Sequence, residues 1–241
     1  MNIENILNHP KIEESTKIVN NINDDMIGRV ALNQGAQATH VLYIVKELLG
    51  DKCKRVLDIG TLWGGSIITM MQSEYKSHFV SIDFFNGYYK ELTSFEEDPV
   101  CGGTNTMGKV SANIERHNKY DHSYDLVEGS SYDLSVIENV HSLLDNSIDL
   151  LFIDGDHRKA GVIKDFDAYS ELVTVGGIVI FDDYWTGDLA KYAWKNKSHW
   201  DEPERMDIVG AYAELESRDD FYKKWKSIGL IADKKIIQKI A

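Results

Sequence analysis

The stretch RVLDIGTLWGGS, residues 55–66, decides the fold. It opens with a continuous apolar run interrupted only by Asp58, which is typical of a strand buried on both faces of a sheet. Glycines at positions 60, 64 and 65 then allow a tight turn into a helix that we expect to begin near Ser66. Because the first N–H groups of a helix have no intrahelical partner, this arrangement predicts a ligand site at the turn. A purely structural strand–helix turn is the alternative.

Four further apolar runs predict buried strands: HFVSID at 78–83, YDLVEGS at 124–130, IDLLFIDG at 148–155 and GGIVIFDD at 176–183. Helical stretches separate them, which predicts an α/β domain with a mostly parallel sheet covered on both faces.

The two ends of the chain follow other patterns. Residues 1–50 predict a helical N-terminal extension, whose clearest helix covers 36–49 and stops at Gly50. At the other end we expect a helix that ends near Ser227. IGLIA and KKIIQKI then follow closely enough to pair as an antiparallel hairpin.

Two connections are longer than a crossover needs, at 84–106 and 184–207, and both are rich in aromatic residues and glycine. Each leaves the carboxyl end of a strand, where open α/β sheets bind their ligands. We therefore expect lids or substrate-binding insertions within a single domain that spans 1–241. Surface insertions that only pack on the body are the alternative.

Composition narrows the classes of function. The chain has 241 residues, 43% hydrophobic and 27% charged, with a formal net charge of −13. This balance excludes a disordered chain, and the negative charge disfavours nucleic acids and anionic membranes as partners. The polar N-terminus lacks the apolar segment of a signal peptide, and no run reaches the length of a membrane span. With only Cys53 and Cys101, we expect reduced thiols in a cytoplasmic protein, although one disulfide is the alternative.

The glycine turn differs from that of a dinucleotide-binding protein. Counting from Gly60, Leu62 stands where the middle glycine would meet a pyrophosphate, which disfavours NAD and FAD. Asp83 ends the next strand and is placed to accept hydrogen bonds from both hydroxyls of a ribose. Together these features predict a nucleoside ligand without a diphosphate.

Carboxylates follow the fourth and fifth predicted strands. Asp154 and Asp156 come first, with His157 directly after them, and Asp182 and Asp183 follow the next strand. Because neighbouring strands lie about 4.8 Å apart, their carboxyl ends converge. Such a cluster repels itself unless a cation neutralises it, and oxygen ligands suit Mg²⁺, Mn²⁺ or Ca²⁺. Solvated or helix-capping aspartates are the alternative.

These motifs together resemble the class I S-adenosylmethionine-dependent methyltransferases. DIGTLWGGS, SID, VEGSSYD, FIDGDH and GGIVIFDDYW are most similar to the metal-dependent O-methyltransferases of the macrocin, novobiocin and cephalosporin type, and more distantly to the catechol and caffeoyl-CoA type. The resemblance covers roughly residues 34–183 and the terminal hairpin. It implies a seven-stranded Rossmann-like sheet in the order 3-2-1-4-5-7-6, with the last strand antiparallel.

The resemblance also implies roles for residues of the cofactor site. Asp58, Gly60, Gly64 and Ser66 would surround the methionine part of S-adenosylmethionine, Asp83 would hold its ribose, Ser131 and Tyr132 would lie beside its adenine, and residues 33–35 would cover its methionine end. Asp154 lies at the junction of this site with the metal site.

For the chemistry, the resemblance implies that Asp154, Asp182 and Asp183 hold a divalent cation, most simply Mg²⁺. His157 stands where the catechol-type enzymes have a lysine base, and imidazole is a competent base for an activated alcohol. His157 and Asp154 are thus the predicted catalytic pair. We expect methyl transfer to the hydroxyl of a small sugar-like or natural-product-like acceptor by a homo-oligomer. The alternatives are a metal-independent N- or O-methyltransferase, a metal-dependent hydrolase and a non-catalytic nucleoside-binding protein.

Overall fold

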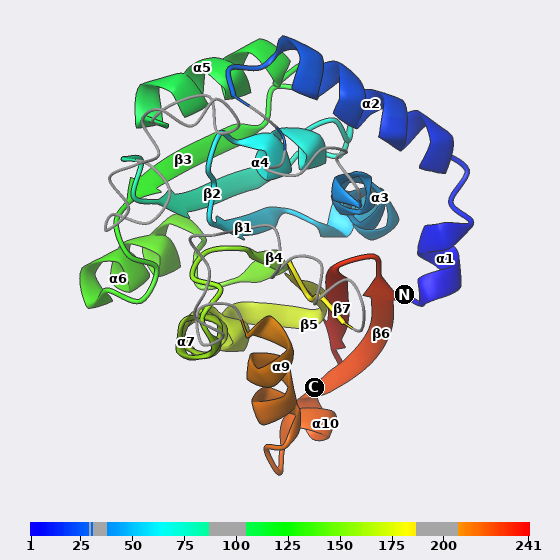
Figure 1. The fold of residues 1–241 in the computed structure, drawn as a ribbon, viewed down its shortest axis with the longest axis vertical. Coiled ribbons are helices and arrows are strands. Elements are labelled where there is room, and N and C mark those ends of the chain that lie inside the picture. The colour runs from blue at the N-terminus through cyan, green and yellow to red at the C-terminus, as the bar shows by residue number, and fades with distance from the viewer. Residues whose placement is uncertain (29, 31–37, 87–104, 187–206) are drawn as a thin grey trace.

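The computed structural model describes residues 1–28, 30, 38–86, 105–186 and 207–241. Its centre is a seven-stranded sheet in the order β3-β2-β1-β4-β5-β7-β6 (Figure 1). The strands are β1 (Arg55–Ile59), β2 (His78–Asp83), β3 (Ser123–Glu128), β4 (Ile148–Ile153), β5 (Val173–Phe181), β6 (Trp225–Ile231) and β7 (Lys234–Lys239). All neighbouring pairs from β3 to β5 are parallel, and β7 is antiparallel to both β5 and β6. The strand order and the antiparallel last strand confirm the predicted fold.

Helices cover both faces of this sheet. They are α1 (Ile3–Leu7), α2 (Ile12–Asp25), α3 (Thr39–Leu49), α4 (Gly65–Met70), α5 (Met107–His117), α6 (Leu134–Leu143), α7 (Lys159–Tyr169), α9 (Ile208–Glu216) and α10 (Phe221–Lys224), with short 3₁₀ helices η1 (Gly50–Lys52) and η3 (Ser170–Leu172). Figure 1 shows α2 to α5 on one face and α6, α7 and α9 on the other. The predicted helical N-terminal extension is confirmed where it is described, in α1 to α3. No described helix combines the length and the apolar character needed to cross a membrane.

Each strand divides its side chains between two apolar cores. Val56 packs with the helices of the first face and its neighbour Leu57 with those of the second. Leu150 and Leu151 divide in the same way on β4. Because successive side chains of a strand point to opposite faces, a run that is apolar throughout fills both cores. The continuous apolar motifs of the sequence therefore become the central strands.

Two predicted boundaries were wrong. The last helix ends at Lys224, so β6 already begins at Trp225, three residues before the predicted strand. Trp225 is buried against the second core, and this packing outweighs the helical pattern of the preceding residues. Strand β5 also begins earlier than expected, at Val173, because an irregularity in its pairing with β4 takes up the glycines that we expected to start it.

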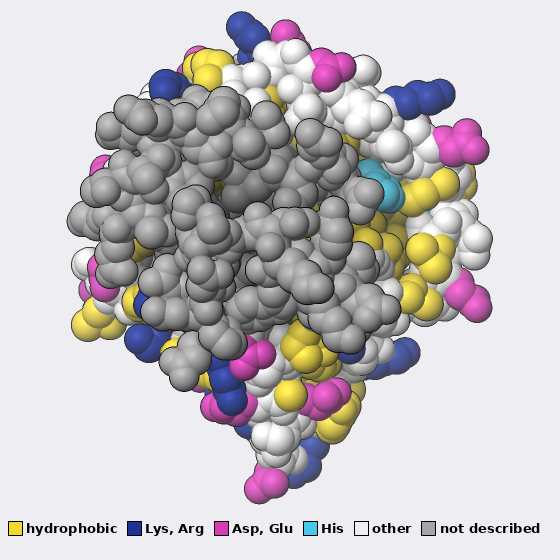
Figure 2. Space-filling model, viewed as in Figure 1, with side chains coloured by type: hydrophobic (Ala, Val, Ile, Leu, Met, Phe, Trp, Pro, Cys, Tyr) yellow, Lys and Arg dark blue, Asp and Glu magenta, His cyan; other side chains and the backbone are white. Residues whose placement is uncertain are grey.

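Figure 2 shows the surface of the face seen in Figure 1. Around the described rim, acidic and basic side chains alternate with apolar ones and do not gather by sign. In this view, the described residues therefore offer no continuous basic surface of the kind that binds nucleic acids.

Gly60 supports a stability prediction with an internal control. Gly60 and Gly176 share a φ of +92°, but a Cβ at Gly60 would lie 2.0 Å from the carbonyl oxygen of Asp154, whereas a Cβ at Gly176 would meet nothing within 4 Å. We expect Gly176→Ala to cost about 1–3 kcal/mol for backbone strain alone. Gly60→Ala should cost about 1–3 kcal/mol more, from overpacking. Urea unfolding of both variants tests this, and equal losses would contradict the close approach of Gly60 to Asp154.

Candidate functional site

The glycine turn between β1 and α4 has an unusual backbone. Gly60 and Gly64 have φ values of +92° and +87°, and Leu62 between them has a φ of +47°. Leu62 thus adopts a left-handed conformation at the position where a dinucleotide-binding turn has glycine, and such a conformation is uncommon for a branched apolar residue. Its N–H donates to Asp83 Oδ2 over 2.8 Å, so the carboxylate at the end of β2 fixes the turn.

Asp58 and Ser66 lie beneath this turn. Asp58 is fully buried, and its carboxylate accepts hydrogen bonds from the hydroxyls of Ser66, at 2.7 Å, and Ser81. Burial raises the pKa of Asp58 to about 6, and the two hydroxyls oppose this rise. In the described structure, the hydrogen bond between Asp58 and Ser66 connects β1 to α4, the two elements that flank the turn.

Asp83 faces the turn from the end of β2. Its Oδ1 accepts the N–H of Phe85 at 2.8 Å and the amide of Asn105 at 3.3 Å. Burial raises the pKa of this carboxyl, and its backbone donors act in the opposite direction. Since a carboxylate offers about four lone-pair directions, Oδ2 retains capacity for a donor beyond Leu62. The residue therefore suits the predicted ribose contact.

The glycine turn touches the loop after β4. At Gly60 there is no side chain, and the backbone of Asp154 and Gly155 passes through the space that a Cβ would fill. The N–H of Asp154 also donates to Ile59 O over 2.9 Å. The two motifs that the sequence singled out, the glycine turn and the aspartate loop, are thus in direct contact.

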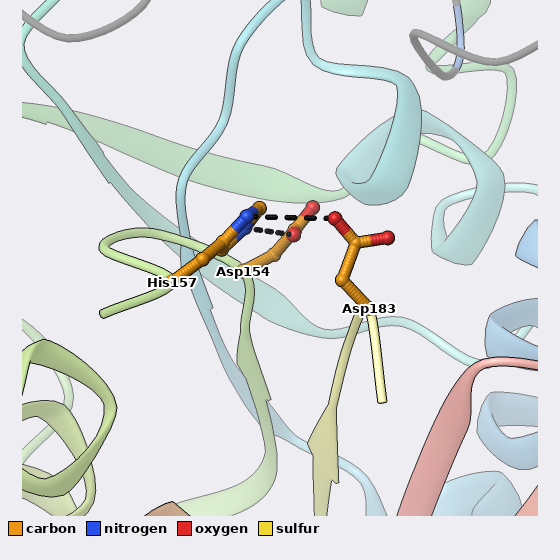
Figure 3. A group of neighbouring side chains, drawn as sticks. All are labelled: Asp154, His157 and Asp183. Atoms are coloured by element: carbon orange, nitrogen blue, oxygen red, sulfur yellow. Dashed lines mark hydrogen bonds and ion pairs between the residues drawn. The ribbon is translucent and has the colours of Figure 1, made fainter. Parts of the chain in front are cut away.

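Asp154, His157 and Asp183 form a compact group at the carboxyl ends of β4 and β5 (Figure 3). His157 Nε2 lies 3.0 Å from Asp154 Oδ1, and Nδ1 lies 3.4 Å from Asp183 Oδ2. Burial and the neighbouring Asp182 raise the pKa of Asp154 well above its usual range, and His157 opposes this rise. One ligand atom from each residue lies within 4.8 Å of the others. Carboxylate oxygens this close together suit a divalent cation such as Mg²⁺ or Mn²⁺, and the imidazole of His157 lies beside them.

Asp182, the third predicted ligand, has different neighbours. Its Oδ1 accepts the N–H of Asp183 at 2.8 Å and pairs with the ammonium of Lys234. Asp182 belongs to a second group that could hold a metal, with Asp183 and Asp233. The two groups overlap at Asp183, so the four carboxylates form one continuous acidic cluster.

Sequence reasoning missed Asp233 and Lys234. A signal for them was present, because β7 pairs antiparallel to β5 with Phe181 opposite Lys235. Continued past the end of β5, this register sets Asp182 opposite Lys234 and Asp183 opposite Asp233. The predicted hairpin contained the lysine, but its register on the sheet could not be known from the sequence.

Ser131 and Tyr132, the predicted adenine contacts, follow β3. Ser131 donates its hydroxyl to Asp165 Oδ1 over 2.5 Å, and the Tyr132 hydroxyl lies 3.3 Å from Asp156 Oδ2. Asp156 is bound on both oxygens by Arg158, which lowers its pKa against the opposing effect of burial. Tyr132 thus lies beside the loop that bears Asp154, and the predicted adenine side adjoins the acidic cluster.

Several predicted features lie outside the described residues. These are residues 33–35 and most of the two insertions, 84–106 and 184–207. Of the two cysteines, only Cys53 is described, and it is a buried free thiol.

Comparison with known proteins adds a family match. The model of a family described as a methyltransferase domain matches residues 57–184, more than half of the chain. Among curated proteins, the chain is 30% identical over 158 residues to uncharacterized protein R132 of Acanthamoeba polyphaga mimivirus. That match covers 63% of each protein.

Solved structures share the fold. The MycE methyltransferase of the mycinamycin biosynthetic pathway, in complex with Mg, SAH and mycinamycin VI, has a TM-score of 0.57 and 15% identity. That alignment covers 97% of this chain and 54% of MycE. The O-methyltransferase NovP has a TM-score of 0.54 at 15% identity over 95% of this chain and 98% of its own. At these identities, the comparison supports the fold.

Asp165 yields a prediction on pH and stability. It is fully buried beneath Ser131, and burial raises its pKa to about 7, against a usual value of 3.8. The folded chain therefore holds a proton that the unfolded chain has lost between these two values. Stability attributable to Asp165 should fall as the pH rises from about 4 to 7, by at most about 1.4 kcal/mol per pH unit.

The Asp165→Asn variant cannot ionise and should lack this contribution. Its free energy of unfolding should thus rise relative to the parent chain between pH 4.5 and 7, whatever the constant offset from the substitution. Chemical unfolding at several pH values measures the difference. A difference independent of pH would contradict the buried, protonated carboxyl.

Proposed function

The chain belongs to the methyltransferase domain family, and on that premise we propose that it transfers a methyl group from S-adenosylmethionine to a hydroxyl oxygen of a small molecule, assisted by a divalent cation. The family match and the strand order agree with the resemblance drawn from the sequence motifs. The acceptor and the cation are the parts of this proposal that go beyond the family.

One observation carries the proposal: the contact between the glycine turn and the aspartate loop. A methyl donor seated on the turn at Gly60 would lie beside Asp154, and an acceptor held at the Asp154–Asp183 group would lie next to that donor. Methyl transfer needs the nucleophile and the sulfonium methyl in line and in contact, and holding them so removes much of the barrier. The two sites adjoin as this reaction requires.

The cofactor would be held by residues of three strand ends. Asp83 would accept from the ribose, the turn around Leu62 would face the methionine part, and Ser131 with Tyr132 would border the adenine. Asp58 and Ser66 would support the cofactor site indirectly, because the hydrogen bond between them fixes the strand and the helix that carry the turn.

The acidic cluster would prepare the acceptor. A divalent cation held there would lower the pKa of an alcohol and so favour its deprotonated, more nucleophilic form at neutral pH. Asp154, Asp182 and Asp183 would be its ligands. His157 lies between two of these carboxylates, so its imidazole is within reach of a hydroxyl presented to the cluster and would take the proton.

The solved structures support the choice of acceptor class. MycE is described with Mg, SAH and mycinamycin VI, and NovP is described as an O-methyltransferase. We therefore propose a hydroxylated natural product or sugar as the acceptor.

A metal-independent methyltransferase is the second candidate, and Lys234 is the observation that favours it. The ammonium of Lys234 already neutralises Asp182, so part of the acidic cluster is balanced without a metal. A metal-dependent hydrolase would leave the Asp83–Leu62 contact and the glycine turn without a role.

Asp83→Ala tests the cofactor site. The substitution should weaken binding of S-adenosylmethionine by about 1.5–3 kcal/mol, the scale of hydrogen bonds to a charged group. Isothermal titration of the full chain measures this. Asp125→Ala, on the adjacent strand β3 and paired with His78 in the described part of the chain, serves as the control and should bind as the parent chain does. Unchanged affinity in Asp83→Ala would remove the ribose contact.

A second experiment tests metal and base. The chain is incubated with labelled S-adenosylmethionine and a panel of hydroxylated sugars and polyketides, and methylated products are detected by mass spectrometry. Chelation with EDTA or Asp182→Ala should abolish turnover and leave cofactor affinity nearly intact. His157→Ala should lower kcat by about 10²–10⁴. His141→Ala is the control, because the imidazole of that histidine contacts Ala168 O and the ring of Tyr169 among the described residues, away from the acidic cluster.

The outcomes separate the candidates. Full activity in excess EDTA would establish the metal-independent reaction instead. A His157→Ala variant as fast as the parent chain would assign the base to another group.

A further inference from the structure

Lys234 is a buried cation at the acidic end of the sheet. Its side chain is 3% exposed, and its ammonium pairs with Asp182 and, over 3.2 Å, with Asp233 Oδ1. It also lies 6.0 Å from the centroid of the Phe152 ring. A buried ammonium costs several kcal/mol unless carboxylates compensate for the lost water. Here the ammonium has such partners, and one of them is the predicted metal ligand Asp182.

The contact fixes one oxygen of Asp182. Oδ1 receives both the ammonium of Lys234 and the N–H of Asp183, and these two donors hold the carboxylate plane in place. Oδ2 is then the oxygen left to turn towards a cation. Partners of this kind orient metal ligands, and their loss typically weakens metal affinity about 10–100-fold.

We propose that Lys234 is a positioning residue of the cation site, which acts by orienting Asp182. This inference rests on the proposed function, because it assigns Lys234 to the cation on which that function depends. It also gives the C-terminal hairpin a role, since the turn between β6 and β7 delivers Asp233 and Lys234 to the ends of the parallel strands. The N–H of Tyr184 donates to Asp233 O over 2.8 Å and ties this turn to the residues that follow Asp183.

A different role for Lys234 would be competition with the divalent cation for the same carboxylates. The strand order argues against it, because β5 separates β7 from β4. Lys234 therefore approaches the cluster from the side of Asp182, while Asp154 and His157 approach from the other side of Asp183. The two roles also predict opposite changes in cation affinity when Lys234 is replaced. Loss of a competitor would tighten cation binding, whereas loss of an orienting donor would weaken it.

The test measures Mn²⁺ affinity of the full chain by electron paramagnetic resonance, without any acceptor. Lys234→Met removes the donor and the charge and should raise the dissociation constant about 10–100-fold. Lys234→Gln keeps an N–H donor and should stay within about threefold of the parent chain, whereas a purely electrostatic role would make Gln and Met equal. Affinity for S-adenosylmethionine should not change in either variant.

Lys239→Met is the matched control. Lys239 lies on the same strand, its side chain is 8% exposed, and its ammonium binds the carbonyl oxygens of Ser170 and Glu171. It also lies over the Trp225 ring, as Lys234 lies over Phe152. Its replacement removes a similarly buried ammonium far from the acidic cluster and should leave Mn²⁺ affinity as it is.

A double-mutant cycle keeps the proposal testable if Lys234→Met does not fold. If Lys234 acts through Asp182, then Asp182→Asn and Lys234→Met combined, which removes both charges of the ion pair, should bind Mn²⁺ no more weakly than Asp182→Asn alone. Additive losses would overturn the proposal.

The remaining outcomes are distinct. Unchanged or tighter Mn²⁺ binding in Lys234→Met would overturn the role of Lys234 and leave the proposed metal dependence intact. A parent chain that binds no Mn²⁺ would overturn both.

Discussion

The absence of a side chain at Gly60 is the constraint on which the site depends. Because Gly60 has no Cβ, the backbone of Asp154 and Gly155 passes directly against the turn after β1. Asp83 holds the same turn, because its carboxylate accepts a hydrogen bond from the N–H of Leu62. Three strand ends are thus tied together, β1 to β4 by a backbone contact and β1 to β2 through the carboxylate of Asp83. A site built on such contacts keeps its parts in place, which is what a reaction between two bound molecules requires.

Most of the fold was predictable because its central strands are apolar on both faces. A run such as the one from Ile148 to Ile153 supplies both cores at once, and only a buried parallel strand uses such a run fully. The ends of the sheet were less predictable. At Trp225, burial of one large aromatic side chain in the second core decides the start of β6, and the local pattern does not contain that information.

The residues of the candidate site also differ in whether the sequence alone could suggest them. Asp154, Asp182 and Asp183 could be proposed from the sequence because they lie just after two recognisable strands, and their role as ligands stays a prediction. Asp233 and Lys234 could not, since their proximity to Asp182 depends on the antiparallel register between β5 and β7. Register is set by side chains that fill the two cores, such as Phe181 on one face of the sheet and Ile236 on the other, and therefore by the tertiary structure.

The aspartates of this chain differ in role because they differ in their donors. Asp58 is buried, yet two hydroxyls satisfy its carboxylate, so it stabilises the turn and has little left to offer a ligand. Asp154 is only partly buried, and its neighbours are His157 and further carboxylates. A partly buried carboxylate among other carboxylates is unfavourable until positive charge reaches it, and the ammonium of Lys234 pairs with Asp182 and Asp233. The negative charge that Lys234 does not pair with lies at Asp154 and Asp183, where the glycine turn meets the aspartate loop. The same charges that oppose one another in the fold are therefore the basis on which we propose a cation beside the proposed methyl donor.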